Sequence, residues 1–139
     1  MLKKIMIDKT GALSHADDFI AFCDRAAAVV KQIGIEELSG GWQQHAEHFI
    51  DVRDLEELQQ QGYIPGACHL SKGWLEANIH HLTTDKSAVL ILYCGSGKRS
   101  LLAAQSLQQM GYLKVCSLQG GFKAWKAAGQ AIEHMDLAK

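Results

Sequence analysis

The chain has 139 residues, of which 47% are hydrophobic and 21% are charged, and its formal net charge at pH 7 is −1. This length and composition fit one compact globular domain and leave no room for a second catalytic domain. A net charge near zero provides no global basic field for nucleic acid or for an anionic membrane surface, so any attraction for anions must be local.

The N-terminal segment is not expected to be a secretory leader or a membrane span. Residues 1–8 carry two lysines and meet Asp8 and Lys9 before an apolar signal core develops. No stretch reaches the roughly 20 apolar residues that a membrane span needs. The cysteines lack CxxC spacing and are too sparse for a disulfide framework; they are Cys23, Cys68, Cys94 and Cys116. We therefore expect reduced thiols and a cytoplasmic location.

Taken in chain order, helix and strand patterns alternate. A helical stripe of apolar residues covers about residues 17–33, and Gly34 is expected to end that helix. A strand follows over residues 48–52. Asp54 then caps a short helix that Gly62 ends.

The second half of the chain continues the alternation. After a turn at residues 64–67, which holds the only proline, the pattern predicts a helix over residues 74–82 and a strand over residues 87–93. Another helical stripe follows, then a strand over residues 114–117 and a closing helix through Trp125. Strands separated by helices imply an α/β domain with a mainly parallel sheet covered on both faces, whose ligands bind at the carboxyl ends of the strands.

The loop after the strand at residues 87–93 combines one thiol, two glycines and two cations. Glycines let a loop turn its backbone N–H groups inward, and the start of a helix adds the positive end of its dipole. Such surroundings favour a thiolate, so we expect Cys94 to be a nucleophile near neutral pH. The anion cradle is expected to consist of Gly95, Ser96, Gly97, Lys98, Arg99 and Ser100.

Five short sequence motifs follow one another along the chain. They are Asp51-Val52-Arg53 with Glu56 and Glu57, Gly62-Tyr63-Ile64-Pro65-Gly66-Ala67, the loop from Cys94 to Ser100, Met110-Gly111-Tyr112, and Leu118-Gln119-Gly120-Gly121-Phe122-Lys123-Ala124-Trp125. In these motifs the chain resembles a rhodanese-family sulfurtransferase domain over about residues 35–132. Tyr63 departs from the family's usual His, and the first thirty or so residues have no place in the family pattern.

The resemblance implies a single rhodanese-like domain at residues 35–132, with an N-terminal helical extension at 1–34 and a C-terminal tail at 133–139. It also implies that residues around Ile35 form the opening strand and short helix. By the same resemblance, Asp51 and Arg53 lie at a neighbouring strand end and help to order the loop. Their residue types alone are equally compatible with a purely structural ion pair.

The activity that the resemblance implies is transfer of sulfane sulfur. The Cys94 thiolate attacks the outer sulfur of a small anionic donor such as thiosulfate, sulfite leaves, and a persulfide waits for cyanide or a thiol, which could belong to a protein. Inward N–H groups stabilise both anionic states. Lys98 as a point charge, and Arg99 through its planar fork, are expected to attract the donor. No cofactor is expected.

Other chemistries stay open at this point. Cysteine phosphatases use C-x5-R, whereas Cys94 and Arg99 form the smaller C-x4-R loop, and no general acid for a leaving alcohol is identifiable. A phosphatase or arsenate reductase is therefore a weaker alternative than a non-catalytic sulfur carrier or binding module. The sequence does not specify the physiological donor and acceptor, the pathway or the oligomeric state.

The remaining cysteines and histidines are interpreted as structural. Cys23 and Cys116 lie in apolar patterns typical of buried residues, whereas Cys68 follows the proline turn and a redox role for it stays open. Two histidine pairs, His45 with His48 and His80 with His81, lack nearby cysteine or carboxylate ligands at recognised spacing. We therefore expect no metal site.

Overall fold

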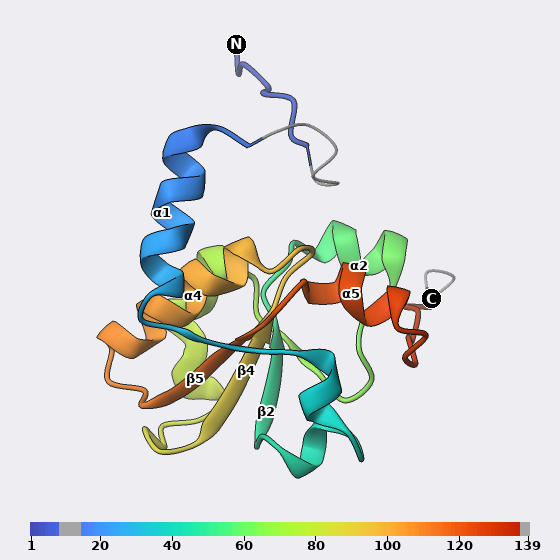
Figure 1. The fold of residues 1–139 in the computed structure, drawn as a ribbon. Helices are drawn as coiled ribbons and strands as arrows, with labels where there is room; N and C mark the ends of the chain where they lie inside the picture. The colour runs from blue at the N-terminus through green and yellow to red at the C-terminus, as the bar shows by residue number, and fades with distance from the viewer. Residues whose placement is uncertain (9–14, 137–139) are drawn as a thin grey trace.

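A parallel sheet of five strands forms the centre of the computed structural model, which describes residues 1–8 and 15–136 (Figure 1). The strands run in the order β1-β5-β4-β2-β3, and each pairs in parallel with its neighbours. Their bounds are β1 Lys31–Ile33, β2 His48–Asp51, β3 Cys68–His69, β4 Val89–Tyr93 and β5 Lys114–Leu118. The α-helices are α1 Asp17–Ala27, α2 Leu55–Gln61, α3 Leu75–Asn78, α4 Lys98–Gln109 and α5 Gly121–Ala127.

Helices cover both faces of the sheet, as the alternation of elements predicts. Along β4, Leu90 and Leu92 pack with residues of α1, α3 and α4 on one face. Ile91 and Tyr93 pack with residues of α5 on the other face. Both faces of this central strand are therefore buried, which explains its continuous apolar sequence.

The prediction of one helix over residues 17–33 is wrong at its end. Helix α1 stops at Ala27, and Lys31–Ile33 forms strand β1 at the edge of the sheet, paired with β5. The apolar residues Val30 and Ile33 are buried in either conformation, so their pattern could not separate a helix from a strand. Residues 31–33 form a strand because their backbone N–H and C=O groups pair with those of β5. A further turn of helix α1 would leave those groups of β5 without a partner.

Three smaller differences concern short elements. The opening strand was expected around Ile35, but strand β1 ends at Ile33. Ile35–Leu38 forms the short 3-10 helix η1. The helix expected over residues 74–82 is broken into η3 (Lys72–Trp74), α3 and η4 (Ile79–His81). Strand β3 has two residues and was missed, because so short an element carries no periodic signal. The remaining 3-10 helix is η2 (Trp42–Gln44) among the described residues.

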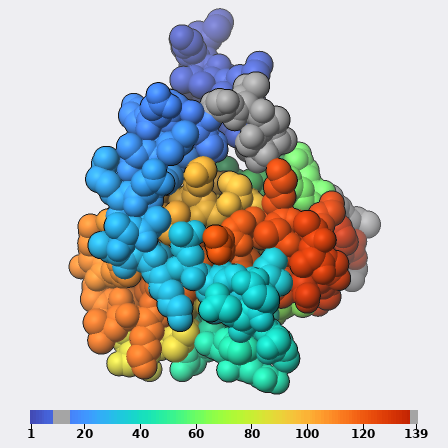
Figure 2. Space-filling model, viewed as in Figure 1, coloured from blue at the N-terminus to red at the C-terminus, as the bar shows by residue number. Residues whose placement is uncertain are grey.

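The N-terminal extension packs on the domain through the second half of α1. Cys23 and Ala26 are buried, and Gln108 of α4 donates a hydrogen bond to the Val29 carbonyl at 3.0 Å. The first half of α1 and residues 1–8 lie above α4 and α5 in Figure 2. The division of the chain into an extension at 1–34, a domain at 35–132 and a tail at 133–139 stays a prediction.

Within the described parts of the chain, no helix is both long enough and apolar enough to cross a membrane.

Candidate active site

Cys94 lies where β4 ends, between the sheet and the start of α4. The alternation along β4 directs its side chain to the face covered by α4, where it packs with the core, and the residue is fully buried. The strand thus ends with its thiol at the carboxyl edge of the sheet, as predicted.

Backbone N–H groups of the following loop point at the sulfur. The amide of Gly97 donates to Cys94 Sγ at 3.1 Å, and the amide of Ser100 donates at 3.3 Å. Gly97 has φ of +97°, a conformation that other residues rarely adopt, and it allows the loop to turn into helix α4. Two amide donors and the positive end of α4 stabilise negative charge on the sulfur.

A buried hydroxyl pair extends this hydrogen-bond network. Ser100 Oγ lies 3.4 Å from Cys94 Sγ and 2.7 Å from the hydroxyl of Ser117 on β5. Both serines are fully buried. Ser117 was not among the predicted site residues, although a polar side chain at an inward position of a buried strand is a signal that could have identified it.

Helix α5 holds the first part of the loop from the opposite side. Its Phe122 amide donates to the Cys94 carbonyl at 2.8 Å, and the Lys123 amide donates to the Gly95 carbonyl at 3.0 Å. Gly121 lies directly against the same two carbonyl groups with φ of +57°, so a Cβ there would collide with backbone. This contact is the physical reason for glycine at position 121.

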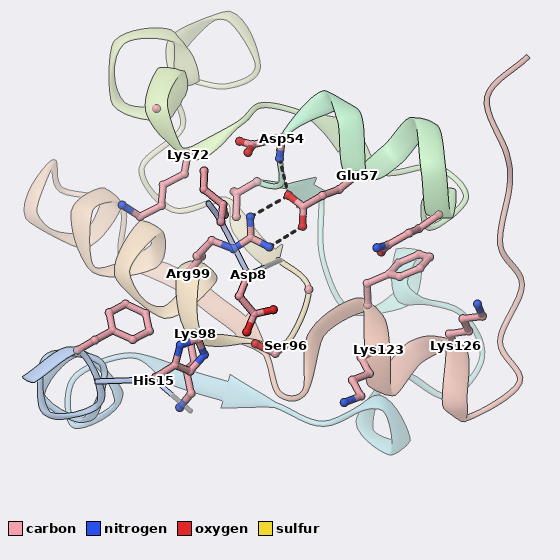
Figure 3. A pocket seen from close by; sticks show the side chains of 17 residues that line it. Asp8, His15, Asp54, Glu57, Lys72, Ser96, Lys98, Arg99, Lys123 and Lys126 are labelled. Atoms are coloured by element: carbon pink, nitrogen blue, oxygen red, sulfur yellow. Dashed lines mark hydrogen bonds and ion pairs between the residues drawn. The ribbon is translucent and has the colours of Figure 1, made fainter. Parts of the chain in front are cut away.

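The guanidinium of Arg99 forms an ion pair with Glu57. Its two terminal nitrogens donate to the two carboxylate oxygens of Glu57 at 2.9 and 2.8 Å (Figure 3). The Asp54 amide also donates to Glu57, at 3.0 Å. Burial alone would raise the pKa of Glu57, but the hydrogen bonds and charge of Arg99 outweigh it and lower that pKa. The planar fork that we expected to face an oxyanion therefore ties the loop to α2.

Asp51 and Arg53 form a second ion pair, which is almost completely buried. Arg53 Nη2 donates to Asp51 at 2.8 Å and to the Gly62 carbonyl at 2.8 Å. Its guanidinium also lies over the Phe122 ring, 4.2 Å from the centroid. Arg53 thus contacts Phe122, whose amide donates to the Cys94 carbonyl; that the ion pair helps to order the loop stays a prediction.

A cavity of about 740 Å³ lies over the loop. Of the predicted cradle residues, Gly95, Ser96, Lys98 and Arg99 line it, while Gly97 and Ser100 point their amides at the buried sulfur beneath. The other basic residues of its lining are Lys72, Lys123 and Lys126 (Figure 3). The described lining has five Lys and Arg side chains against three carboxylates, so its field favours an anion.

The remaining cysteines differ in burial. Cys23 is buried as predicted, whereas Cys116 is only partly buried. Cys68 is also partly buried, and its thiol lies 3.5 Å from the Phe49 carbonyl. The redox role considered for Cys68 stays untested.

The histidines and acids of residues 1–8 and 15–136 form no group of three metal-ligating side chains. His45 contacts the Ser39 carbonyl at 2.9 Å, and His80 and His81 lie with their rings 4.1 Å apart.

Comparison with known proteins identifies relatives of this chain. A curated Bacillus subtilis protein, named "Putative sulfur carrier protein YrkF", is 32% identical over 78 residues, which are 56% of this chain and 40% of that protein. The chain therefore spans less than half the length of this relative.

Two solved structures have a similar fold. The thiosulfate sulfurtransferase of Pseudomonas aeruginosa matches with a TM-score of 0.73 and 28% identity, over 85% of this chain and 23% of that one. A Rhodopseudomonas palustris protein of unknown function, described as a "Possible Tyrosine Phosphatase", matches with a TM-score of 0.74 and 28% identity, over 88% of this chain and 97% of that one.

The family assignment rests on a match to the sequence pattern of one domain family. The sequence pattern of the rhodanese-like domain matches residues 34–128. This match covers most of the chain, including β2, the Cys94 loop and α5. The chain belongs to the rhodanese-like domain family.

Proposed function

We propose that this protein is a sulfurtransferase of the rhodanese type, which carries sulfane sulfur as a persulfide on Cys94. The observation that carries the proposal is the pair of backbone amides, from Gly97 and Ser100, that point at Cys94 Sγ. They stabilise a sulfur anion without a separate general base. The name of the Pseudomonas aeruginosa structure adds support, since that protein is a thiosulfate sulfurtransferase.

In the first step, the Cys94 thiolate attacks the outer sulfur of thiosulfate. A new S–S bond forms, the S–S bond of the donor breaks, and sulfite leaves with the electron pair. Lys98 lines the cavity next to the loop, so its ammonium group favours entry of the dianion. Arg99 contributes less charge than expected, because Glu57 neutralises it.

In the second step, a nucleophilic acceptor such as cyanide or a thiolate attacks the outer sulfur of the persulfide. The bond to Cys94 breaks, and the same amides receive the thiolate again. Neither step needs a cofactor. A protein thiol is a further possible acceptor, and a cytoplasmic location stays a prediction.

Two other functions give different outcomes. A sulfur carrier would form the same persulfide but release it only to a dedicated partner, as the name of the Bacillus subtilis relative suggests for that protein. A phosphatase needs a guanidinium free to hold a tetrahedral phosphate, and the Arg99 fork is instead occupied by Glu57. The geometry therefore favours sulfur transfer over phosphoryl chemistry.

Mass spectrometry after treatment with thiosulfate tests the proposal. We expect the mass to rise by one sulfur, located on Cys94, and to return to its original value when cyanide is added. Cys116→Ser is the matched control and should still gain the sulfur. If the wild type takes up no sulfur, or if Cys94→Ser takes up as much as the wild type, the proposal is wrong. Loading without any turnover to small acceptors would support the carrier function instead.

A further inference from the structure

The N-terminal extension forms one wall of the cavity over the Cys94 loop. Ile7, Asp8, His15 and Phe19 line the cavity together with Ser96 and Lys98. Figure 3 shows the side chains of Asp8 and His15 together with those of Ser96 and Lys98 in the lining of this cavity. The residues matched by the domain family begin at 34, so this wall is a feature of this chain that the family match does not include.

Helix α1 determines where Phe19 lies. Cys23 and Ala26 are buried against the domain, and Phe19 occupies the same helix face one turn before Cys23. The ring of His15 packs edge-on against Phe19, with centroids 5.0 Å apart. His15 and Phe19 therefore form an aromatic pair in the lining of the cavity, at a position that the packing of α1 determines.

Basic side chains line the same cavity as His15 and Phe19. Lys98 begins α4, Lys72 belongs to η3, and both line the cavity. Burial raises the pKa of the Cys23 thiol on α1, and the positive charges of Lys98 and Lys72 oppose this rise. The cavity lining thus combines the apolar surface of the extension with two cations from η3 and α4.

The cavity is larger than an inorganic donor requires. Its volume of about 740 Å³ falls within the range of roughly 300–1,000 Å³ typical of pockets for drug-sized molecules. A small anion such as thiosulfate or cyanide fills only a minor part of it. The remaining volume includes the part that the extension encloses.

We propose that this part of the cavity, made by Phe19, His15, Lys72 and Lys98, binds the organic portion of the sulfur acceptor, a thiol whose apolar chain ends in an anionic group such as a carboxylate. The inference rests on the proposed function, because it assigns a substrate class to the same site. The apolar chain packs on Phe19, and the ammonium groups attract the anionic end.

The transfer to such an acceptor is balanced without a further reactant. The acceptor thiolate attacks the outer sulfur of the Cys94 persulfide and forms a new S–S bond. The bond between that sulfur and Cys94 Sγ breaks, and its electron pair stays on Cys94 as thiolate. The acceptor leaves as a persulfide, and no external oxidant or reductant is consumed.

Steady-state kinetics with three alkyl thiols and thiosulfate as donor tests the substrate class. The probes are 8-mercaptooctanoate, 8-mercapto-1-octanol and 3-mercapto-1-propanol, whose thiol groups have similar intrinsic reactivity. We expect KM to be lowest for the octanoate and about tenfold or more higher for the short alcohol, with the long alcohol between them. Equal KM values for all three thiols would overturn the inference.

Matched variants locate the subsite. Phe19→Ala should raise KM for both long thiols by about five- to tenfold and leave the short alcohol unchanged. Phe22→Ala is the control, because Phe22 lies on the same helix but is 49% exposed and does not line the cavity. Lys72→Gln should raise KM for the octanoate alone, whereas Lys114→Gln, at an exposed position of β5, should change nothing.

The outcomes separate this inference from the proposed function. If thiosulfate leaves no persulfide on Cys94, the proposed function itself fails. If the persulfide forms and passes to cyanide, but Phe19→Ala and Phe22→Ala behave alike with every thiol, only the subsite is refuted. If all three thiols are equally poor acceptors while a protein thiol is a good one, the cavity serves a macromolecular partner and the inference is wrong.

Discussion

The ion pair between Arg99 and Glu57 makes a quantitative prediction about stability. Glu57→Gln keeps one acceptor oxygen but replaces the other with an NH₂ group that faces an Arg99 donor. Charge-assisted hydrogen bonds contribute about 1.5–3 kcal/mol each, against about 0.5–1.5 kcal/mol for neutral ones. The Glu57 carboxylate accepts two such bonds and is 2% exposed, whereas Arg99 is 33% exposed and can recruit water. After this discount for solvent, we expect the free energy of unfolding to fall by about 1–2 kcal/mol.

The same substitution should change the pH dependence of stability. Arg99 lowers the pKa of Glu57 in the folded chain below its ordinary value of 4.5. A carboxyl group whose pKa is lower in the folded state adds stability that is fully present above its unfolded pKa. This contribution is lost as the pH falls through the folded pKa. The difference between wild type and variant should therefore be largest near neutral pH and shrink in acid.

Urea denaturation, followed by tryptophan fluorescence, measures this difference near neutral pH and again at about pH 3.5. Glu56→Gln is a matched control, because Glu56 is the neighbouring carboxylate on α2 but is exposed. That variant should differ from the wild type by less than about 0.5 kcal/mol. The argument is refuted if Glu57→Gln is as stable as the wild type near neutral pH, or if its deficit is the same at both pH values.

Three further predictions concern the loop. Cys94→Ala should abolish thiosulfate:cyanide sulfurtransfer while the melting temperature, from circular dichroism, stays near that of the wild type; retained turnover would exclude the persulfide mechanism. Gly121→Ala should destabilise the fold by more than about 1 kcal/mol in urea denaturation and slow persulfide formation, because its Cβ collides with the carbonyl groups beside the thiol; a variant that is both stable and active would contradict the close contact. Ser117→Ala should leave a functional thiol but weaken the network through Ser100, and a severalfold slower persulfide formation in stopped-flow measurements is expected; an unchanged rate would make that hydroxyl pair purely structural.

Much of the fold could be predicted because the relevant signals are local. The apolar run that forms β4 and the helical stripe that forms α4 flank the Cys94 loop, and such patterns depend only on neighbouring residues. The position of the thiol at a strand end follows from the same patterns. Edge strand β1 and two-residue strand β3 depend instead on pairing with distant segments, which the sequence pattern does not record.

The charges of the site were also predictable only where they depend on neighbouring residues. The sequence identifies Lys98 and Arg99 as cations of the loop, but not the partner that each finds. Glu57 lies 42 positions before Arg99 and reaches it only because α2 and the loop lie side by side in the folded chain. We therefore expect attraction of an anion to Cys94 to depend more on the lysines that line the cavity than on the arginine of the loop. Because Lys72 lies outside the loop motif, the proposed acceptor subsite predicts that the specificity of this site depends on segments that the loop sequence does not contain.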